Sequence, residues 1–320
     1  MRAETDDGSL GLALPTENEA LFHGGGAEFY QHIERDYKGV KTKPWQGGQY
    51  GFVRNPVQTP EGMVYTRFHE GIDIRPLQRD ARGEPLDEIR AIAPGTVVYT
   101  NLVPGFSNYG NYVVIEHQWG GSPYYSLYGH LHSISARPNQ RVTRGEVIGI
   151  MGYTGEGLNQ ERAHVHLELN LMLSREFDGW HRTFYPADPN HHGLYNGINL
   201  IGLDIAKLYL ALQKRPSLTI PQFLAQEEVF YRVRIPLSKH FELAKRYPWM
   251  IASPPHAEQQ SWELSFNRAG VPLKISPSLT AVTAPQLAYV KKRSIDYSYL
   301  TRGQLGGHGD SATLSESGTR

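Results

Sequence analysis

The sequence predicts a mainly β fold, an antiparallel β-sandwich or barrel-like core followed by a C-terminal α+β region. Short runs rich in β-branched and aromatic residues recur between residues 49 and 173, separated by Gly, Pro and Asn. After Asn199 the pattern changes to longer runs with the apolar periodicity of helices. The 320 residues suffice for one large domain or two ordinary ones.

The elements follow in order from these patterns. Pro94-Gly95 and Arg144-Gly145 are turn signals between β-rich runs, and Tyr124 to Leu131 alternates as a strand does. The other strands that we predict in the core are residues 89–93, 96–99, 112–115 and 147–150. In the C-terminal region we predict helices at 203–212, 221–228 and 238–247, with strands at 229–236 and 261–266.

These patterns divide the chain into five parts. A polar extension with one short helix at 27–35 is expected either to lie over the main domain, where it could cover a groove, or to be partly disordered. The last residues are rich in Gly, Ser and Thr, which is typical of disorder. The parts are the extension (1–48), the β-rich domain (49–185), a linker (186–199), an accessory α+β domain (200–302) and a disordered tail (303–320).

Composition excludes several classes of function. The 32 basic and 32 acidic residues balance, which argues against a nucleic-acid partner. No run of about 18 apolar residues is present, so no membrane span is predicted. The chain has no cysteine, so any metal must be held by His, Asp and Glu. Composition leaves the oligomeric state open.

The stretch from Ala163 to Leu169 reads as a strand that carries chemistry. His164, His166 and Glu168 alternate with apolar residues, so all three side chains share one face. Two imidazoles already placed on one face favour a metal site. Such a pair is also common by coincidence, so the interpretation depends on a third ligand elsewhere in the chain.

Further ligand candidates lie upstream. His69 and Asp73 are four residues apart, and Gly71 with its β-branched neighbours disfavours a helix between them. An extended segment would then present both side chains to one ion. With one histidine of the later pair, the set becomes His, Asp and His with a fourth position open, which is the layout of a catalytic zinc.

Four motifs in one order carry a family resemblance. They are His69-Glu70-Gly71-Ile72-Asp73, Tyr128-Gly129-His130-Leu131, Gly152-Tyr153-Thr154-Gly155 and His164-Val165-His166-Leu167-Glu168. Over roughly residues 49–173 the sequence resembles the lysostaphin-type (LytM-like) zinc metallopeptidases. The resemblance implies a zinc endopeptidase that cuts stem or cross-bridge peptides of bacterial peptidoglycan. It also implies that His69, Asp73 and His166 bind Zn²⁺, and that His130 and His164 are catalytic.

The implied chemistry is physically coherent. Zinc lowers the pKa of a bound water towards about 7, and a neutral imidazole beside that water can take its proton. Whether His130 or His164 is the base stays open. We interpret Glu168 as a partner that orients a histidine. We expect His117, His132, Thr154 and Gly155 to be structural. His191 and His192 have low weight as ligands. Tyr128 could either pack or bind substrate.

Two departures and two alternatives accompany this hypothesis. The loop 156–162 is charged and lacks the Pro-containing segment usual before the paired histidines, and the region after Asn199 lies outside the resemblance. The alternatives are a non-catalytic module that binds wall peptides or regulates an enzyme through the same groove, and a zinc hydrolase of small non-wall peptides. The implied substrate predicts a cell-envelope or secreted location, although residues 1–7 lack the basic start of a secretory signal.

Overall fold

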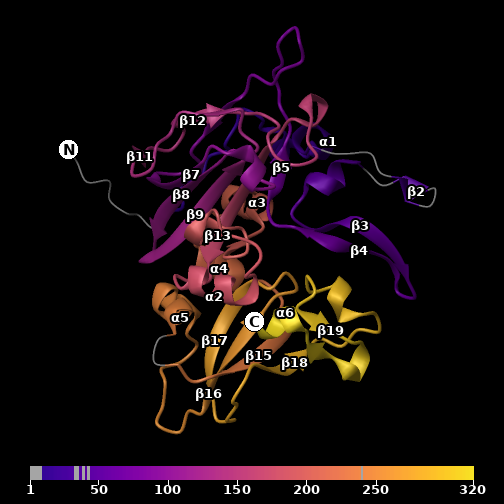
Figure 1. The fold of residues 1–320 in the computed structure, drawn as a ribbon, viewed down its shortest axis with the longest axis vertical. Helices are drawn as coiled ribbons and strands as arrows, with labels where there is room; N and C mark the ends of the chain where they lie inside the picture. Colours follow the sequence, from indigo (N-terminus) through magenta and orange to yellow (C-terminus); the bar gives the residue numbers. More distant parts are fainter. Residues whose placement is uncertain (1–8, 32–35, 38–39, 42–43, 239–240) are drawn as a thin grey trace.

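The computed structural model describes residues 9–31, 36–37, 40–41, 44–238 and 241–320. The predicted fold class is confirmed: the protein is mainly β, its sheets are antiparallel, and short helices gather in the second half of the chain (Figure 1). Among the described residues, no helix combines the length and apolar content needed to cross a membrane.

A seven-stranded sheet forms the centre of the molecule. Its strands in spatial order are β11 (Arg141–Val142), β7 (Gly95–Asn101), β8 (Tyr112–Trp119), β9 (Ser122–Gly129), β13 (Val165–Met172) and β14 (Leu200–Gly202), with β5 (Ile72–Ile74) also paired to β13. The predicted strand at 124–131 is therefore shifted by two residues, and it ends before His130 because that residue leaves the extended conformation.

Smaller sheets surround this one. They are β10 (Ser133–Ile134), β12 (Val147–Ile150) and β6 (Glu88–Arg90); the hairpin β3 (Gly51–Thr59) and β4 (Gly62–His69); and the pair β1 (Asp36–Tyr37) and β2 (Val40–Lys41). The hairpin projects from the side of the molecule towards the C-terminal region (Figure 1).

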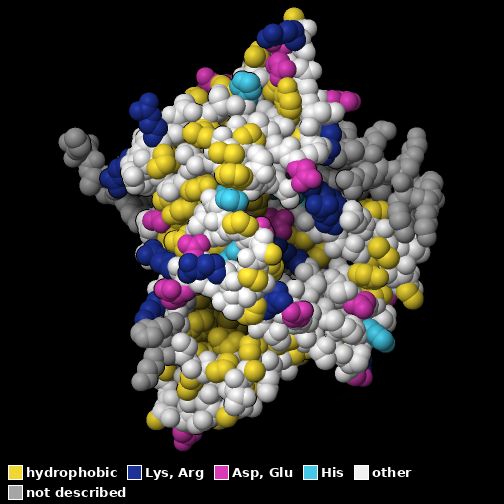
Figure 2. Space-filling view, viewed as in Figure 1, with side chains coloured by type: hydrophobic (Ala, Val, Ile, Leu, Met, Phe, Trp, Pro, Cys, Tyr) yellow, Lys and Arg dark blue, Asp and Glu magenta, His cyan; other side chains and the backbone are white. Residues whose placement is uncertain are grey.

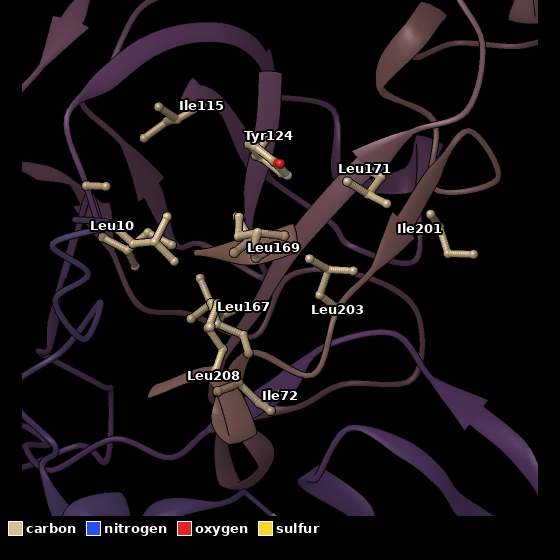
Figure 3. Packing of buried hydrophobic residues seen from close by; sticks show 14 of the residues in the cluster. Leu10, Ile72, Ile115, Tyr124, Leu167, Leu169, Leu171, Ile201, Leu203 and Leu208 are labelled. Atoms are coloured by element: carbon tan, nitrogen blue, oxygen red, sulfur yellow. The ribbon is translucent and has the colours of Figure 1, made fainter. Parts of the chain in front are cut away.

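The core lies beneath the central sheet. Leu167, Leu169 and Leu171 of β13 point together into it (Figure 3). They belong to the same buried cluster as Leu203 and Leu208, which come later in the chain. This is the face that alternation along β13 predicts, opposite to its histidines. The N-terminal segment joins the same cluster through four buried residues, namely Leu10, Leu21, Phe29 and Tyr30. It is thus packed into the main body at these residues.

Three of the four predicted helices are shorter than expected, and the one predicted at 203–212 keeps its length but begins and ends two residues later. The helices that the structure describes are α1 (Gly26–Phe29), α2 (Phe177–Phe184), α3 (Ile205–Lys214), α4 (Ile220–Leu224), α5 (Glu242–Arg246) and α6 (Glu316–Thr319). The expected helix at 27–35 already ends at Phe29, because Tyr30 bridges to Ile74 of β5; residues 32–35 lie outside the described residues.

The C-terminal region shares the core of the β-rich part. Its strands are β17 (Pro272–Ser278), β16 (Ser261–Phe266), β15 (Tyr231–Pro236) and β18 (Gln286–Val290), followed by the pair β19 (Leu305–Gly306) and β20 (Thr313–Leu314). Trp262, Leu264 and Ile275 belong to the same buried cluster as the core strands. Residues 303–320 do not form the disordered tail that their composition predicts, because Leu305 and Leu314 pack into a second apolar cluster.

His117 is structural, and it makes stability depend on pH. Its Nδ1–H donates to the Pro94 carbonyl at 2.8 Å, and its Nε2 lies 2.7 Å from Ser126 Oγ. Burial lowers the pKa of His117 from 6.5 to about 4, although the Pro94 carbonyl acts in the opposite direction. Between these values the unfolded chain binds a proton that the folded protein does not, so stability falls as pH drops.

We therefore expect the free energy of unfolding to decrease by about 2 kcal/mol from this residue alone between pH 7 and pH 5. Urea unfolding at both pH values measures it. A His117→Asn variant keeps a donor for the Pro94 carbonyl but does not titrate. An equal pH dependence in this variant and the wild type would contradict the assignment.

Candidate active site

Strand pairing brings the upstream and downstream motifs together. In the register of β5 with β13, Asp73 lies opposite His166, and on the other side of β13 His166 faces Gly129 of β9. Gly71 makes the approach of β5 possible, since a Cβ there would lie 2.3 Å from the Leu167 carbonyl oxygen. The motif His-Glu-Gly-Ile-Asp thus needs glycine at its centre.

Three side chains converge on one point. His69 Nε2 lies 3.0 Å from Asp73 Oδ1 and 3.1 Å from His166 Nδ1, and His166 Nδ1 lies 2.9 Å from Asp73 Oδ1. All three residues are buried. These short distances bring together the three residues that we predict from the sequence as metal ligands.

The outer nitrogen of each histidine in this cluster has its own acceptor. His69 donates from Nδ1 to the Gln49 carbonyl at 2.8 Å, and His166 donates from Nε2 to Glu168 Oε1 at 2.8 Å. Because a carbonyl and a carboxylate only accept, these bonds place a proton on the outer nitrogen of each ring, so that the lone pair of the neutral ring is directed at the cluster. Glu168 therefore orients a histidine, as the sequence predicts.

His130 and His164 stand beside the cluster as a pair. Their ring centroids are 4.6 Å apart, and His164 Nε2 lies 3.4 Å from Asp73 Oδ1. His130 donates from Nδ1 to the Thr154 carbonyl and His164 from Nδ1 to the Arg162 carbonyl, so each ring keeps a free-to-accept Nε2. His130 has φ 65, a left-handed backbone that β-strand residues do not adopt. Such strain is concentrated at functional sites.

The electrostatics of the cluster favour a cation. Burial alone would raise the pKa of Asp73, but His69, His164 and Arg54 outweigh it and hold that pKa well below its usual value. Burial also opposes charge on His166, yet its hydrogen bonds to Asp73 and Glu168 raise its pKa to about 10. Two buried carboxylates thus hold positive charge at His166, and a bound cation would replace that proton.

The residues present fit a zinc ion. Two imidazole nitrogens and one carboxylate oxygen, all within 4.8 Å of one another, are the donors that zinc takes in hydrolytic enzymes. The hydrogen-bonded outer nitrogens are the usual companions of such ligands. His130 differs, because burial and then the neighbouring His164 hold its pKa well below 6.5. A neutral imidazole of this kind is able to accept a proton.

The cluster opens into a large cavity. Its volume is about 1610 Å³, and His69, His130, His164 and His166 all line it. The far wall comes from the C-terminal sheet, including Val233 and Phe266, and the rim includes the loops 104–109 and 188–198. Figure 2 shows apolar side chains gathered in a hollow below α2, over the strands of that sheet.

The other singled-out residues have structural contacts. Tyr128 is fully buried and its hydroxyl accepts from the Ile92 amide, so it packs inside the protein. His192 is buried between the Tyr99 hydroxyl and the Phe106 carbonyl, and His191 stacks on the Phe106 ring. His132 is exposed. The Thr154 hydroxyl donates to the Leu131 carbonyl and shapes the loop beside His130.

Sequence reasoning missed three side chains near the site. Arg54 pairs with Asp73, with Nη2 2.6 Å from Oδ2. Tyr109 donates its hydroxyl to Glu168 Oε1 at 2.8 Å, and Asn170 donates to Glu168 Oε2 at 2.9 Å. Asn170 continues the alternation of His164, His166 and Glu168, which was the one available signal. Nothing in the spacing of Arg54 or Tyr109 indicates these contacts.

Comparison with known proteins finds similarity over part of the chain. The family model described as Peptidase family M23 matches residues 67–177. Peptidoglycan DD-endopeptidase ShyA of Vibrio cholerae is 40% identical over 85 residues, which are 25% of this chain and 18% of that protein. The catalytic domain of the prophage-encoded M23 protein EnpA from Enterococcus faecalis is 25% identical, covering 44% of this chain and 85% of that one, with a TM-score of 0.28.

A third relative is matched over most of its length. Lipoprotein NlpD of Yersinia enterocolitica is 37% identical over 75 residues, which are 23% of this chain and 69% of that sequence. By contrast, the chain matches between 14% and 29% of the length of three other curated relatives. The family model and the relative from Yersinia together show that this chain belongs to peptidase family M23.

Proposed function

We propose that the protein is a zinc-dependent endopeptidase that hydrolyses peptide bonds of bacterial cell-wall peptidoglycan. The observation that carries this proposal is the set of three converging donors, His69 Nε2, Asp73 Oδ1 and His166 Nδ1. The other ring nitrogen of each histidine is held by a hydrogen bond to an acceptor outside the cluster. ShyA, one of the similar proteins, is named a peptidoglycan DD-endopeptidase. That name supports the substrate class and a site of action in the cell envelope.

In this proposal His69, Asp73 and His166 hold zinc. When bound, zinc supplies a Lewis acid that polarises the scissile carbonyl and makes a water molecule acidic enough to attack at neutral pH. His130 and His164 present accepting Nε2 atoms beside that position, because their Nδ1 protons are engaged by backbone carbonyls. One of the two takes the proton of the attacking water.

The remaining steps follow from proton balance. The water oxygen bonds to the carbonyl carbon, and the imidazolium that results donates a hydrogen bond to the oxyanion. The carbon–nitrogen bond then breaks, and the proton passes from the imidazolium to the leaving amine. Glu168 keeps His166 in the metal-binding tautomer throughout, since its two oxygens are held by Tyr109 and Asn170.

The non-catalytic alternative has less support. In relatives of that kind the metal ligands are typically lost, whereas here the three nominated ligands and both catalytic histidines meet in one buried cluster. Substrate profiling separates the small-peptide alternative from the proposed function.

The test combines metal analysis with product identification. Purified protein is expected to carry one zinc per chain and to release fragments with new amino termini from isolated sacculi, identified by mass spectrometry. A panel of short peptides without sugar, assayed in parallel, separates a wall enzyme from a general peptidase. Zinc-loaded protein that releases no wall fragment would contradict the proposal.

A further inference from the structure

Arg54 holds the oxygen of Asp73 that the histidines do not contact. His69, His164 and His166 approach Oδ1 at 3.0, 3.4 and 2.9 Å. Arg54 Nη2 approaches Oδ2 at 2.6 Å. The side chain of Asp73 is 9% exposed, whereas that of Arg54 is 28% exposed. The two oxygens of one buried carboxylate therefore have separate partners.

The backbone around Arg54 is built to make this contact. The pairing of β3 with β4 shifts register between Phe52 and Arg54, a bulge of the kind that redirects a side chain beside a functional site. Asn55 follows with φ 54, in the left-handed region. The guanidinium is also fixed from its other side, because Arg54 Nε donates to the Gly47 carbonyl at 2.8 Å.

We propose that Arg54 is a positioning residue that makes Asp73 a one-oxygen metal ligand, by occupying Oδ2 and turning Oδ1 towards the histidines. The inference rests on the proposed zinc site. A planar fork anchored at two acceptors fixes both the distance and the rotation of the carboxylate. Outer partners of this kind typically affect metal affinity by about 10–100-fold.

The charge of Arg54 and its orienting effect on Asp73 should change zinc affinity in opposite directions. A guanidinium near a cation site repels the ion, so charge alone would make zinc bind more tightly once Arg54 is removed. We expect the reverse result. Without Arg54, Oδ2 of the buried carboxylate is unpaired and the rotation of the carboxylate is no longer fixed. Zinc must then order the carboxylate as it binds, and this cost lowers its affinity.

The experiment measures zinc affinity by competition with a chromophoric chelator. Arg54→Gln is expected to bind zinc about 10–100-fold more weakly, with Arg54→Lys in between. In an Asp73→Asn background, Arg54→Gln should cause no additional loss. With Co²⁺ in place of zinc, the visible absorption of Arg54→Gln should weaken, because the released Oδ2 raises the coordination number.

A matched control lies directly across the hairpin. Arg67 pairs with Arg54 in register and is exposed, so Arg67→Gln makes the same change of charge and should keep wild-type zinc affinity. Zinc affinity of Arg54→Gln equal to or above wild type would overturn the inference. Wild-type protein that binds zinc but releases no wall fragment would contradict only the proposed function. Failure of the wild type to bind zinc would contradict both.

Discussion

Replacing His166 by alanine should remove zinc from the protein and abolish cleavage of sacculi. His166 supplies one of the three donors that converge among the described residues, so the loss of affinity should exceed the roughly 100-fold that removal of an outer partner causes. Zinc content after dialysis and release of wall fragments measure the two effects. Full zinc occupancy in the variant would contradict the ligand assignment.

The control is a histidine of the same domain outside the cluster. His132 is exposed and lies two residues after His130, so His132→Ala should keep both zinc and activity. Because His166→Ala leaves two buried carboxylates without their shared partner, its fold requires a check by circular dichroism. His166→Gln is the second variant, since an amide can still donate to Glu168.

Removing His130 or His164, which lie beside the three-donor cluster, should have a different effect from removing His166. His130→Ala and His164→Ala should keep one zinc per chain while kcat falls by about 10²–10⁴-fold, the usual contribution of a general acid or base. Neither residue belongs to the three-donor cluster, and each is held by a backbone carbonyl. Steady-state kinetics on a soluble muropeptide, together with zinc analysis, test this.

The pH profiles of the two variants decide which histidine is the base. The variant that lacks the base should lose the acid limb of the profile of kcat/KM. Alanine at position 130 also carries strain, because φ 65 costs a residue with a Cβ about 1 kcal/mol. His130→Asn tolerates that backbone and serves as the second variant. Loss of zinc in these variants would contradict the separation of ligands from catalytic residues.

The donor cluster could be predicted because its residues sit in short motifs with a regular period. Alternation placed His164, His166 and Glu168 on one face of a strand, and Gly71 with its neighbours excluded a helix between His69 and Asp73. These are local rules, and β5 and β13 obey them. The strands at 147–150 and 261–266 have the predicted limits for the same reason.

Contacts set by tertiary structure were not predictable in this way. Arg54 reaches Asp73 through a bulge, and bulges have no clear signal in a single sequence. Tyr109 contacts Glu168 from a loop, where there is no periodic pattern to indicate the contact. The prediction for residues 303–320 was wrong for a related reason: their polar composition indicates disorder, but Leu305, Ala312 and Leu314 pack against an apolar cluster formed by other parts of the chain. The far wall of the cavity likewise comes from a sheet that had no recognisable motif.

The hairpin has a consequence for any attempt to isolate a minimal fragment. The segment shared with the family begins at residue 67, yet the carbonyl of Gln49 sets the His69 tautomer and Arg54 holds Asp73. At its tip, Glu61 accepts from Arg293 and Ser294 of the C-terminal region. A fragment cut at the family limits would keep the three proposed metal ligands and lose the contacts that orient His69 and Asp73. The proposed metal centre therefore depends on residues outside the segment shared with the family.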